Sequence, residues 1–186
     1  MTVEPARLRI VHYPDPVLRQ RAEEVREFTP LLAEIARRMF ELMRQAGGIG
    51  LAAPQVGLPM RLFVADVPGP EGGAPEGPPV STGGPKVYVN PVLSEACGDV
   101  EPLEEGCLSL PSIRGDVWRP PVVRMTARDL HGEEFTLVGA GLMARCWQHE
   151  CDHLDGVLIV DKFEAESRSK NRPLVKALER AYRPRG

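Results

Sequence analysis

The sequence has no apolar segment that is long enough to cross a lipid bilayer. A membrane-spanning helix needs about 18 consecutive apolar residues, and no such run occurs among the 186 residues. The opening residues, Met1 to Ile10, also lack the apolar stretch of a secretory signal. Because a transit-like leader is absent too, we expect a protein of a bacterial cytoplasm with no membrane partner.

Basic residues are not in excess. Lys and Arg number 23 and Asp and Glu number 26, which gives a formal net charge of -3 at pH 7. Proteins that bind a phosphate backbone usually carry clustered positive charge. Nucleic acid is therefore not an expected partner.

Cysteine is scarce. The cysteines are too few and too irregularly spaced for a disulfide framework, and a reducing compartment would keep them as thiols. Any special role for a cysteine is then metal binding or redox chemistry. The four residues are Cys97, Cys107, Cys146 and Cys151.

Length and composition are those of an ordinary globular domain. A chain of 186 residues, 42% of them hydrophobic and 26% charged, is long enough to form one core. We expect residues 1–186 to form a single domain. Residues 68–85 contain six Pro and six Gly, so this stretch is expected to be an exposed loop inserted between strands.

Two N-terminal segments carry helix-start signals. Asp15-Pro16 and Thr29-Pro30 each place a capping residue before a proline that suits the first helical position. The first pair predicts a short helix. The second precedes Leu31 to Ala46, where apolar residues recur at helical spacing until Gly47-Gly48 ends the pattern.

The remainder alternates between strand and helix patterns. A helix is expected from Ala140 to Leu154, ended by Gly156, and a last helix from near Pro173 to about Tyr182. Together with the strands this indicates an α+β fold with largely antiparallel sheets. The predicted strands are Arg61 to Val67, Lys86 to Asn90, Val122 to Asp129 and Glu134 to Val138.

The most informative motif is HExxH, at His149 to His153 in the predicted helix. Residues four apart lie one above the other on a helix, so both imidazoles can bind one ion while Glu150 reaches a water beside it. Alternatively, these polar residues merely satisfy one another. Burying them without a partner is costly, which favours the metal site of a hydrolase.

A catalytic metal usually takes a third protein ligand. Cys107 is a candidate, because it follows Gly106, which permits an unusual backbone, and because it offers a thiolate. A lone cysteine is more often a small core residue, so the residues alone leave this assignment open.

A third unusual segment, Gly48 to Gln55, is small and apolar and ends in an amide. It is not a phosphate-binding loop, because no Lys-Ser/Thr pair follows the glycines. It predicts either a tight turn beside a packed strand or the wall of an active site, where Gln55 would polarise a carbonyl.

These three motifs, read as GxGLAxxQ, EGCLS and HExDH, occur here in order, and the chain closely resembles the peptide deformylases. The resemblance extends from Tyr13 to about Lys162 and implies an α+β fold with antiparallel sheets around a central metal-binding helix. It also implies the metal-dependent hydrolysis of N-formylmethionyl peptides and nascent chains, which releases formate, with possible proximity to the ribosome.

The resemblance also implies roles for particular residues. Glu150 matches the general acid/base, and Gln55 and the Leu108 N–H match the groups that hold the formyl oxygen. The implied metal ligands are Cys107, His149 and His153. The residues that the resemblance places along the substrate groove are Ile49, Gly50, Gly106 and Arg114. The implied ion is Fe(II), with Zn, Ni or Co as substitutes.

Two other classes of protein fit part of the sequence. A zinc peptidase would use HExxH with a downstream glutamate as third ligand, and Glu179 has a suitable spacing, but Cys107 and Gln55 would then have no role. A closed structural metal site would need a fourth protein ligand, and the presence of Glu150 argues for an open one.

Overall fold

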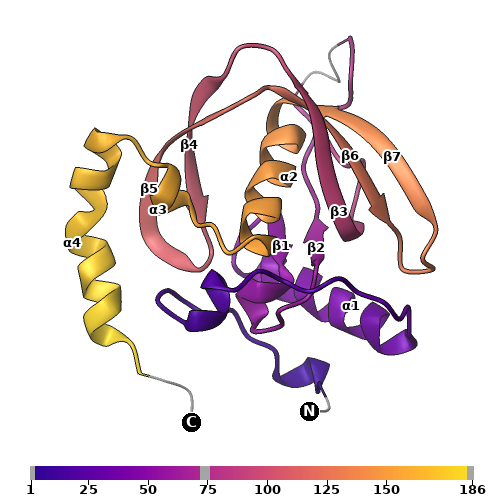
Figure 1. Cartoon of the computed structure of the whole chain (residues 1–186), viewed down its shortest axis with the longest axis horizontal. Helices are drawn as coiled ribbons and strands as arrows, with labels where there is room; N and C mark the ends of the chain where they lie inside the picture. The colour runs from indigo at the N-terminus through magenta and orange to yellow at the C-terminus, as the bar shows by residue number, and fades with distance from the viewer. Residues whose placement is uncertain (1–2, 72–75, 184–186) are drawn as a thin grey trace.

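The computed structural model describes residues 3–71 and 76–183, which form two antiparallel sheets and four α-helices (Figure 1). The predicted α+β class is confirmed. The helices are α1 (Pro30–Gln45), α2 (Gly141–Leu154), α3 (Ile159–Lys162) and α4 (Ala165–Ala181), with 3-10 helices at Pro5–Arg7, Pro16–Arg19 and Ala53–Val56. The strands are β1 (Gly50–Ala52), β2 (Leu62–Ala65), β3 (Lys86–Cys97), β4 (Glu101–Cys107), β5 (Leu110–Arg119), β6 (Val122–Arg128) and β7 (Glu134–Ala140).

The larger sheet has the strand order β1-β2-β3-β6-β7, and all its neighbouring strands are antiparallel. Strands β4 and β5 form a separate two-stranded sheet. Helix α2 lies between the two sheets (Figure 1), which confirms the expected arrangement of antiparallel sheets around a central helix.

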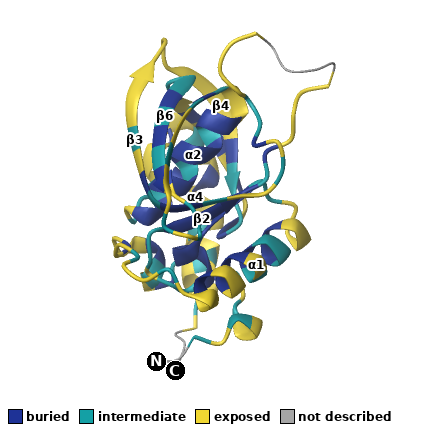
Figure 2. Cartoon of the chain, turned by 90° about the vertical axis from the view of Figure 1, so that its right-hand side faces the viewer, coloured by how far each residue is buried: buried dark blue, intermediate teal, exposed yellow. Residues whose placement is uncertain are grey.

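Strand β2 is buried on both faces because the larger sheet is covered on each side. Phe63 and Ala65 pack in the cluster that contains α2, whereas Leu62 and Val64 pack in the cluster that contains α1. Alternate side chains of a strand point to opposite faces, so one short strand contributes to two apolar clusters. In Figure 2, β2 and most of α2 are coloured as buried.

Helix α1 matches its prediction closely. It begins at Pro30, and it ends at Gln45, just before Gly47, whose φ of 69° is a left-handed conformation that glycine adopts readily. The short helix after Asp15 is also confirmed, and the Asp15 carboxylate accepts a hydrogen bond from the Val17 N–H at 3.1 Å. Helix α2 likewise follows its prediction and ends two residues before Gly156.

The predicted start of the last helix is wrong. Helix α4 begins at Ala165, eight residues before Pro173, which lies inside it. Proline weakens a helix because it lacks an N–H, but tertiary contacts hold the preceding turns in place. Asn171, which is buried, donates hydrogen bonds to the Arg114 carbonyl at 2.7 Å and to the Ser167 carbonyl at 2.8 Å.

The four predicted strands are present, although β3 continues seven residues beyond Asn90, to Cys97. Three further strands, β1, β4 and β5, carry weak signals in the sequence. Strand β1 has only three residues, and β4 contains Pro102 and a run of exposed residues instead of an apolar alternation. These strands are defined by their partners rather than by their own composition.

The Pro/Gly-rich stretch includes residues 72–75, which lie outside the described residues. Its final part is attached to the body of the protein. The Thr82 hydroxyl accepts a hydrogen bond from the Val67 N–H at 2.9 Å, and the Ala140 N–H donates to the Pro79 carbonyl at 2.8 Å. In the described part of the chain, no helix is long and apolar enough to cross a membrane.

Candidate metal centre

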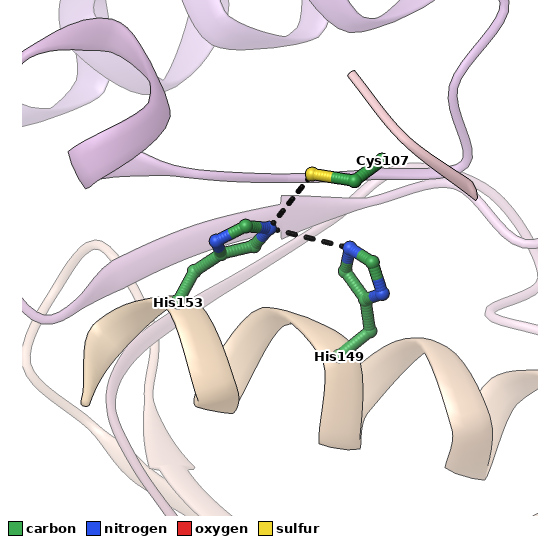
Figure 3. Close-up of side chains that lie close together, drawn as sticks. All are labelled: Cys107, His149 and His153. Carbon is green, nitrogen blue, oxygen red and sulfur yellow. Dashed lines mark hydrogen bonds between the residues drawn. The ribbon is translucent and has the colours of Figure 1, made fainter. Parts of the chain in front are cut away.

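Three side chains from two elements, β4 and α2, converge at one point. Cys107 lies at the end of β4, and His149 and His153 lie one turn apart on α2. One ligand atom from each, the cysteine sulfur and one nitrogen from each imidazole, lies within 4.8 Å of the other two. In Figure 3 both imidazoles extend from α2, and Cys107 approaches them from the side away from this helix.

The distances between these atoms are short. His153 Nε2 lies 3.3 Å from Cys107 Sγ and 3.2 Å from His149 Nε2. Two imidazole nitrogens and a thiolate are donors that Fe(II), zinc and related ions accept. The donor set therefore fits a divalent ion.

The orientation of His149 supports the same assignment. Its Nδ1 lies 3.1 Å from Oε2 of Glu105, so an N–H at Nδ1 can donate to the carboxylate and leave Nε2 with a lone pair for the centre. Histidine ligands of metals usually have such a partner on the other nitrogen. His153 is 1% exposed, and burial lowers its pKa well below the usual range, so that its imidazole is neutral and able to bind.

Glu105 is itself held by two arginines. Arg119 donates to its two oxygens at 2.6 Å and 2.9 Å, and Arg145 donates to Oε1 at 2.9 Å. Burial alone would raise the pKa of Glu105, but hydrogen bonds from Arg119 and His149 hold it well below its usual range. Glu105 is therefore a permanent anion behind His149.

Gln55 is buried and its amide is fixed at both ends. Its Oε1 accepts a hydrogen bond from the Ala52 N–H at 2.9 Å, while Nε2 lies 3.3 Å from Ser109 Oγ and 3.5 Å from Cys107 Sγ. Leu108 follows Cys107 in the tight turn that joins β4 to β5. An amide donor is thereby held beside the sulfur.

Glu150 is 3% exposed and follows His149 on α2. Burial raises its pKa to about 7, with an opposing effect from the nearby charge of His149. Among the described atoms, its Oε2 has no hydrogen-bond partner. A carboxyl group with a pKa near neutrality can both take up and release a proton at pH 7, as general acid/base catalysis requires.

A cavity of about 530 Å³ opens in front of these groups. Predicted site residues from all three motifs line it, whereas His153 lies buried behind it. Those on the wall are Ile49, Gly50, Gln55, Gly106, Cys107, Leu108, Arg114, His149 and Glu150. Segments that are 100 residues apart in the sequence thus meet at one cavity, next to three atoms that could hold a metal ion.

Comparison with known proteins identifies the family of the chain. A family model described as polypeptide deformylase matches residues 7–169. The peptide deformylase of Opitutus terrae is 44% identical over 184 residues, which cover 95% of each chain.

The chain belongs to the polypeptide deformylase family.

Solved structures of peptide deformylases agree with this. A crystal structure of a plant peptide deformylase, PDF1B, has a TM-score of 0.86 at 38% identity and covers 98% of this chain and 94% of its own. The deformylase of Thermotoga maritima has a TM-score of 0.75 at 39% identity and covers 84% of this chain and 97% of its own. The protein is therefore an enzyme, a hydrolase that removes the N-formyl group from N-formylmethionyl peptides in a metal-dependent reaction.

The deformylase structure argues against the peptidase interpretation of HExxH. That interpretation requires Glu179 near the histidines, but the Glu179 carboxylate accepts a hydrogen bond from the Tyr13 hydroxyl at 2.9 Å. Cys107 is the residue that joins the two histidines. Glu179, the candidate third ligand of the rival peptidase, instead lies against the N-terminal segment at the end of α4.

Cys151, in the middle of HExxH, packs in the apolar cluster between α2 and the larger sheet. Burial raises its pKa, so it stays a thiol. All four cysteines of the deformylase are free, as predicted.

Two arginines of the deformylase site had no signal in the sequence. Arg119 and Arg145 stand outside the three motifs, and both bind Glu105. Glu105 precedes Gly106 within the EGCLS motif, so its position was visible, but its role depends on partners from β5 and α2.

Proposed function

We propose that Cys107, His149 and His153 hold one divalent ion and that the ion is Fe(II), with zinc, nickel or cobalt as substitutes. The observation that carries this proposal is the convergence of their three ligand atoms within 4.8 Å, beside the cavity that Glu150 lines. When bound, the ion supplies Lewis acidity for a carbonyl oxygen and for water. With three protein ligands, the site stays open to substrate.

Glu150 is the general acid/base of the proposed mechanism. Its carboxylate takes a proton from water and delivers it to the nitrogen that leaves with the peptide, so that formate and a free amino group result. The pKa of about 7 suits both steps. The buried position of Glu150 keeps bulk water from competing for this proton.

Gln55 and Leu108 stabilise the oxyanion that develops on the formyl group. Gln55 Nε2 is held beside Cys107 by the bond between its Oε1 and the Ala52 N–H. The main-chain N–H of Leu108 is the second donor. Removing one such donor typically costs about a hundredfold in kcat.

The cavity is the proposed binding site for the formyl-methionyl end of the substrate. Ile49, Gly50 and Gly106 contribute to its walls, as does Arg114, whose side chain is 66% exposed. The apolar part of the lining, which includes Ile49, Leu103 and Leu142, suits a methionyl side chain. Residues 1–186 are proposed to act as one catalytic domain.

We place this activity in the cytoplasm of a bacterium, close to the ribosome, where nascent chains emerge. The relative from Opitutus terrae, which matches over 95% of its length, supports a bacterial-type enzyme. Co-sedimentation with ribosomes tests the second part. Protein that stays in the supernatant at low salt would contradict it.

The decisive test is formate release from a formyl-Met tripeptide by protein purified without oxygen and loaded with Fe(II). The wild-type enzyme is expected to turn over, while Glu150→Gln loses about a hundredfold or more of kcat and keeps its metal. Metal analysis of both proteins provides the control. Absence of turnover in fully loaded wild type would overturn the proposed assignment.

A further inference from the structure

Arg145 makes three hydrogen bonds that tie the metal-bearing helix to the smaller sheet. Its guanidinium donates to Glu105 Oε1 at 2.9 Å, to the Val117 carbonyl at 2.8 Å and to the Glu101 carbonyl at 2.9 Å. Its side chain is 11% exposed and lies one turn before His149 on α2. One side chain of α2 thus holds both strands of the β4–β5 hairpin.

The part of β4 that Arg145 holds has little other support. Residues 101–104 are exposed, and β4 pairs with β5 alone in the described structure. The hydrogen bonds that join α2 to β4 in the described chain come from Arg145, His149 and His153, and that of His153 reaches Cys107, the last residue of the strand. The bond from His149 reaches Glu105, at the inner end of the strand, so the outer end depends on Arg145.

This outer end forms one wall of the cavity. Leu103 of β4 and Leu142 of α2 both line the cavity, as does Arg145. The two leucines are 48% and 41% exposed, respectively. Two half-exposed leucines on separate elements provide apolar surface for a bound side chain. Arg145 spans the space between these two elements, β4 and α2.

Arg119 binds the same carboxylate but has a different position. It is 2% exposed, does not line the cavity, and its second partner is Asp152 at 2.8 Å, in the turn of α2 that carries His153. With Arg145 removed, Arg119 still holds both oxygens of Glu105. The support of His149 and the width of the cavity therefore depend on different arginines.

We propose that Arg145 is a positioning residue that determines substrate specificity, because it fixes the distance between the β4 and α2 walls of the cavity. A narrow cavity accepts an unbranched apolar side chain at the first position of the formyl peptide and excludes an aromatic one. The inference rests on the proposed function, since it takes the cavity to hold that side chain.

The test compares the Fe(II) holoenzyme with Arg145→Met, which keeps the length of the side chain and removes its donors. For a formyl-Met tripeptide, KM is expected to rise by about tenfold, while kcat stays within about twofold and the metal content is unchanged. The preference for formyl-Met over formyl-Phe, measured as the ratio of kcat/KM, falls by about tenfold. A widened cavity explains both changes.

Two further variants separate positioning from general stability. Arg37→Met removes an arginine that lies on α1, is 69% exposed and pairs with Glu41, and it is expected to change neither KM nor the preference. Arg119→Met is expected to lose metal. If Arg145→Met does not fold, Arg145→Lys replaces it, because lysine keeps a cation for Glu105; the same changes are then expected at smaller size.

Each failure has a distinct signature. Wild type without formate release overturns the proposed function. Wild type with normal turnover and an Arg145 variant with unchanged KM and unchanged preference overturns the positioning role. A variant that loses metal and kcat while the preference for formyl-Met remains would show that Arg145 acts through His149, which also overturns it.

Discussion

Gly50 has no side chain, and Glu150 occupies the space that one would fill. A Cβ atom added to Gly50 would lie 2.4 Å from Glu150 Oε1 and 2.8 Å from Cys146 Sγ. Real Cβ atoms do not approach other atoms so closely. The glycine is therefore required for the position of the carboxyl group, and not for an unusual backbone angle.

Gly50→Ala is expected to displace the Glu150 carboxyl group and to lower kcat about tenfold to a hundredfold, with the metal content unchanged. Steady-state kinetics on a formyl-Met tripeptide measure this. Gly69→Ala is the matched control, because its added Cβ would meet Ser81 at 3.7 Å, an ordinary contact. Equal kcat values for the two variants would refute the steric argument.

At the scale of elements, α2 and α4 show two different relations between sequence and structure. The boundaries of α2 follow from local signals, namely periodic apolar residues and Gly156. Helix α4 crosses Pro173 because Asn171 anchors its first turns to β5. A local rule predicts a helix end at proline, and a tertiary contact overrides it.

Pro173→Ala restores an N–H that can donate to the Ser169 carbonyl of the preceding turn, because Pro173 is exposed within α4. The free energy of unfolding is expected to rise by about 1 kcal/mol or more. Urea denaturation measures it. Lys170→Ala, an exposed site on the same helix, is expected to change stability by less than about 0.5 kcal/mol. A destabilised Pro173→Ala would mean that the packing of α4 requires the proline.

At the scale of the whole molecule, the proposed ion links parts that are distant in the chain. Cys107 belongs to the smaller sheet, whereas His149 and His153 belong to the helix between the sheets. An ion that binds the folded state and not the unfolded chain stabilises the fold by mass action. Metal loading should therefore be visible in the stability of the whole protein.

Removal of the metal with a chelator is expected to lower Tm by about 5 to 10 °C, which corresponds to about 2.7 kcal/mol at an ion concentration a hundred times its Kd. Adding Fe(II) back without oxygen restores the original Tm. Glu150→Gln should show the same shift, and Cys107→Ser should show none. A Tm that does not depend on the ion in wild type would contradict the cross-link.

The sequence by itself indicated metal-dependent hydrolysis, because the HExxH motif is local. HExxH on a helix places His149, Glu150 and His153 by helical geometry alone. Gln55 and Cys107 each lie in a short motif that contains glycine and can be recognised in the sequence. The α+β class and the bounds of α1 and α2 also follow from short-range periodicity and capping signals.

Only the tertiary structure decided which distant groups support that chemistry. Glu105 of β4 meets Arg119 of β5 and Arg145 of α2, and the roles of these residues depend on contacts across 14 and 40 residues of sequence. No local pattern marks an arginine that donates to carbonyls of another element, because the signal lies in the partner's position. The same reason explains why Glu179, which has a suitable spacing, binds Tyr13, while Cys107 lies beside both histidines.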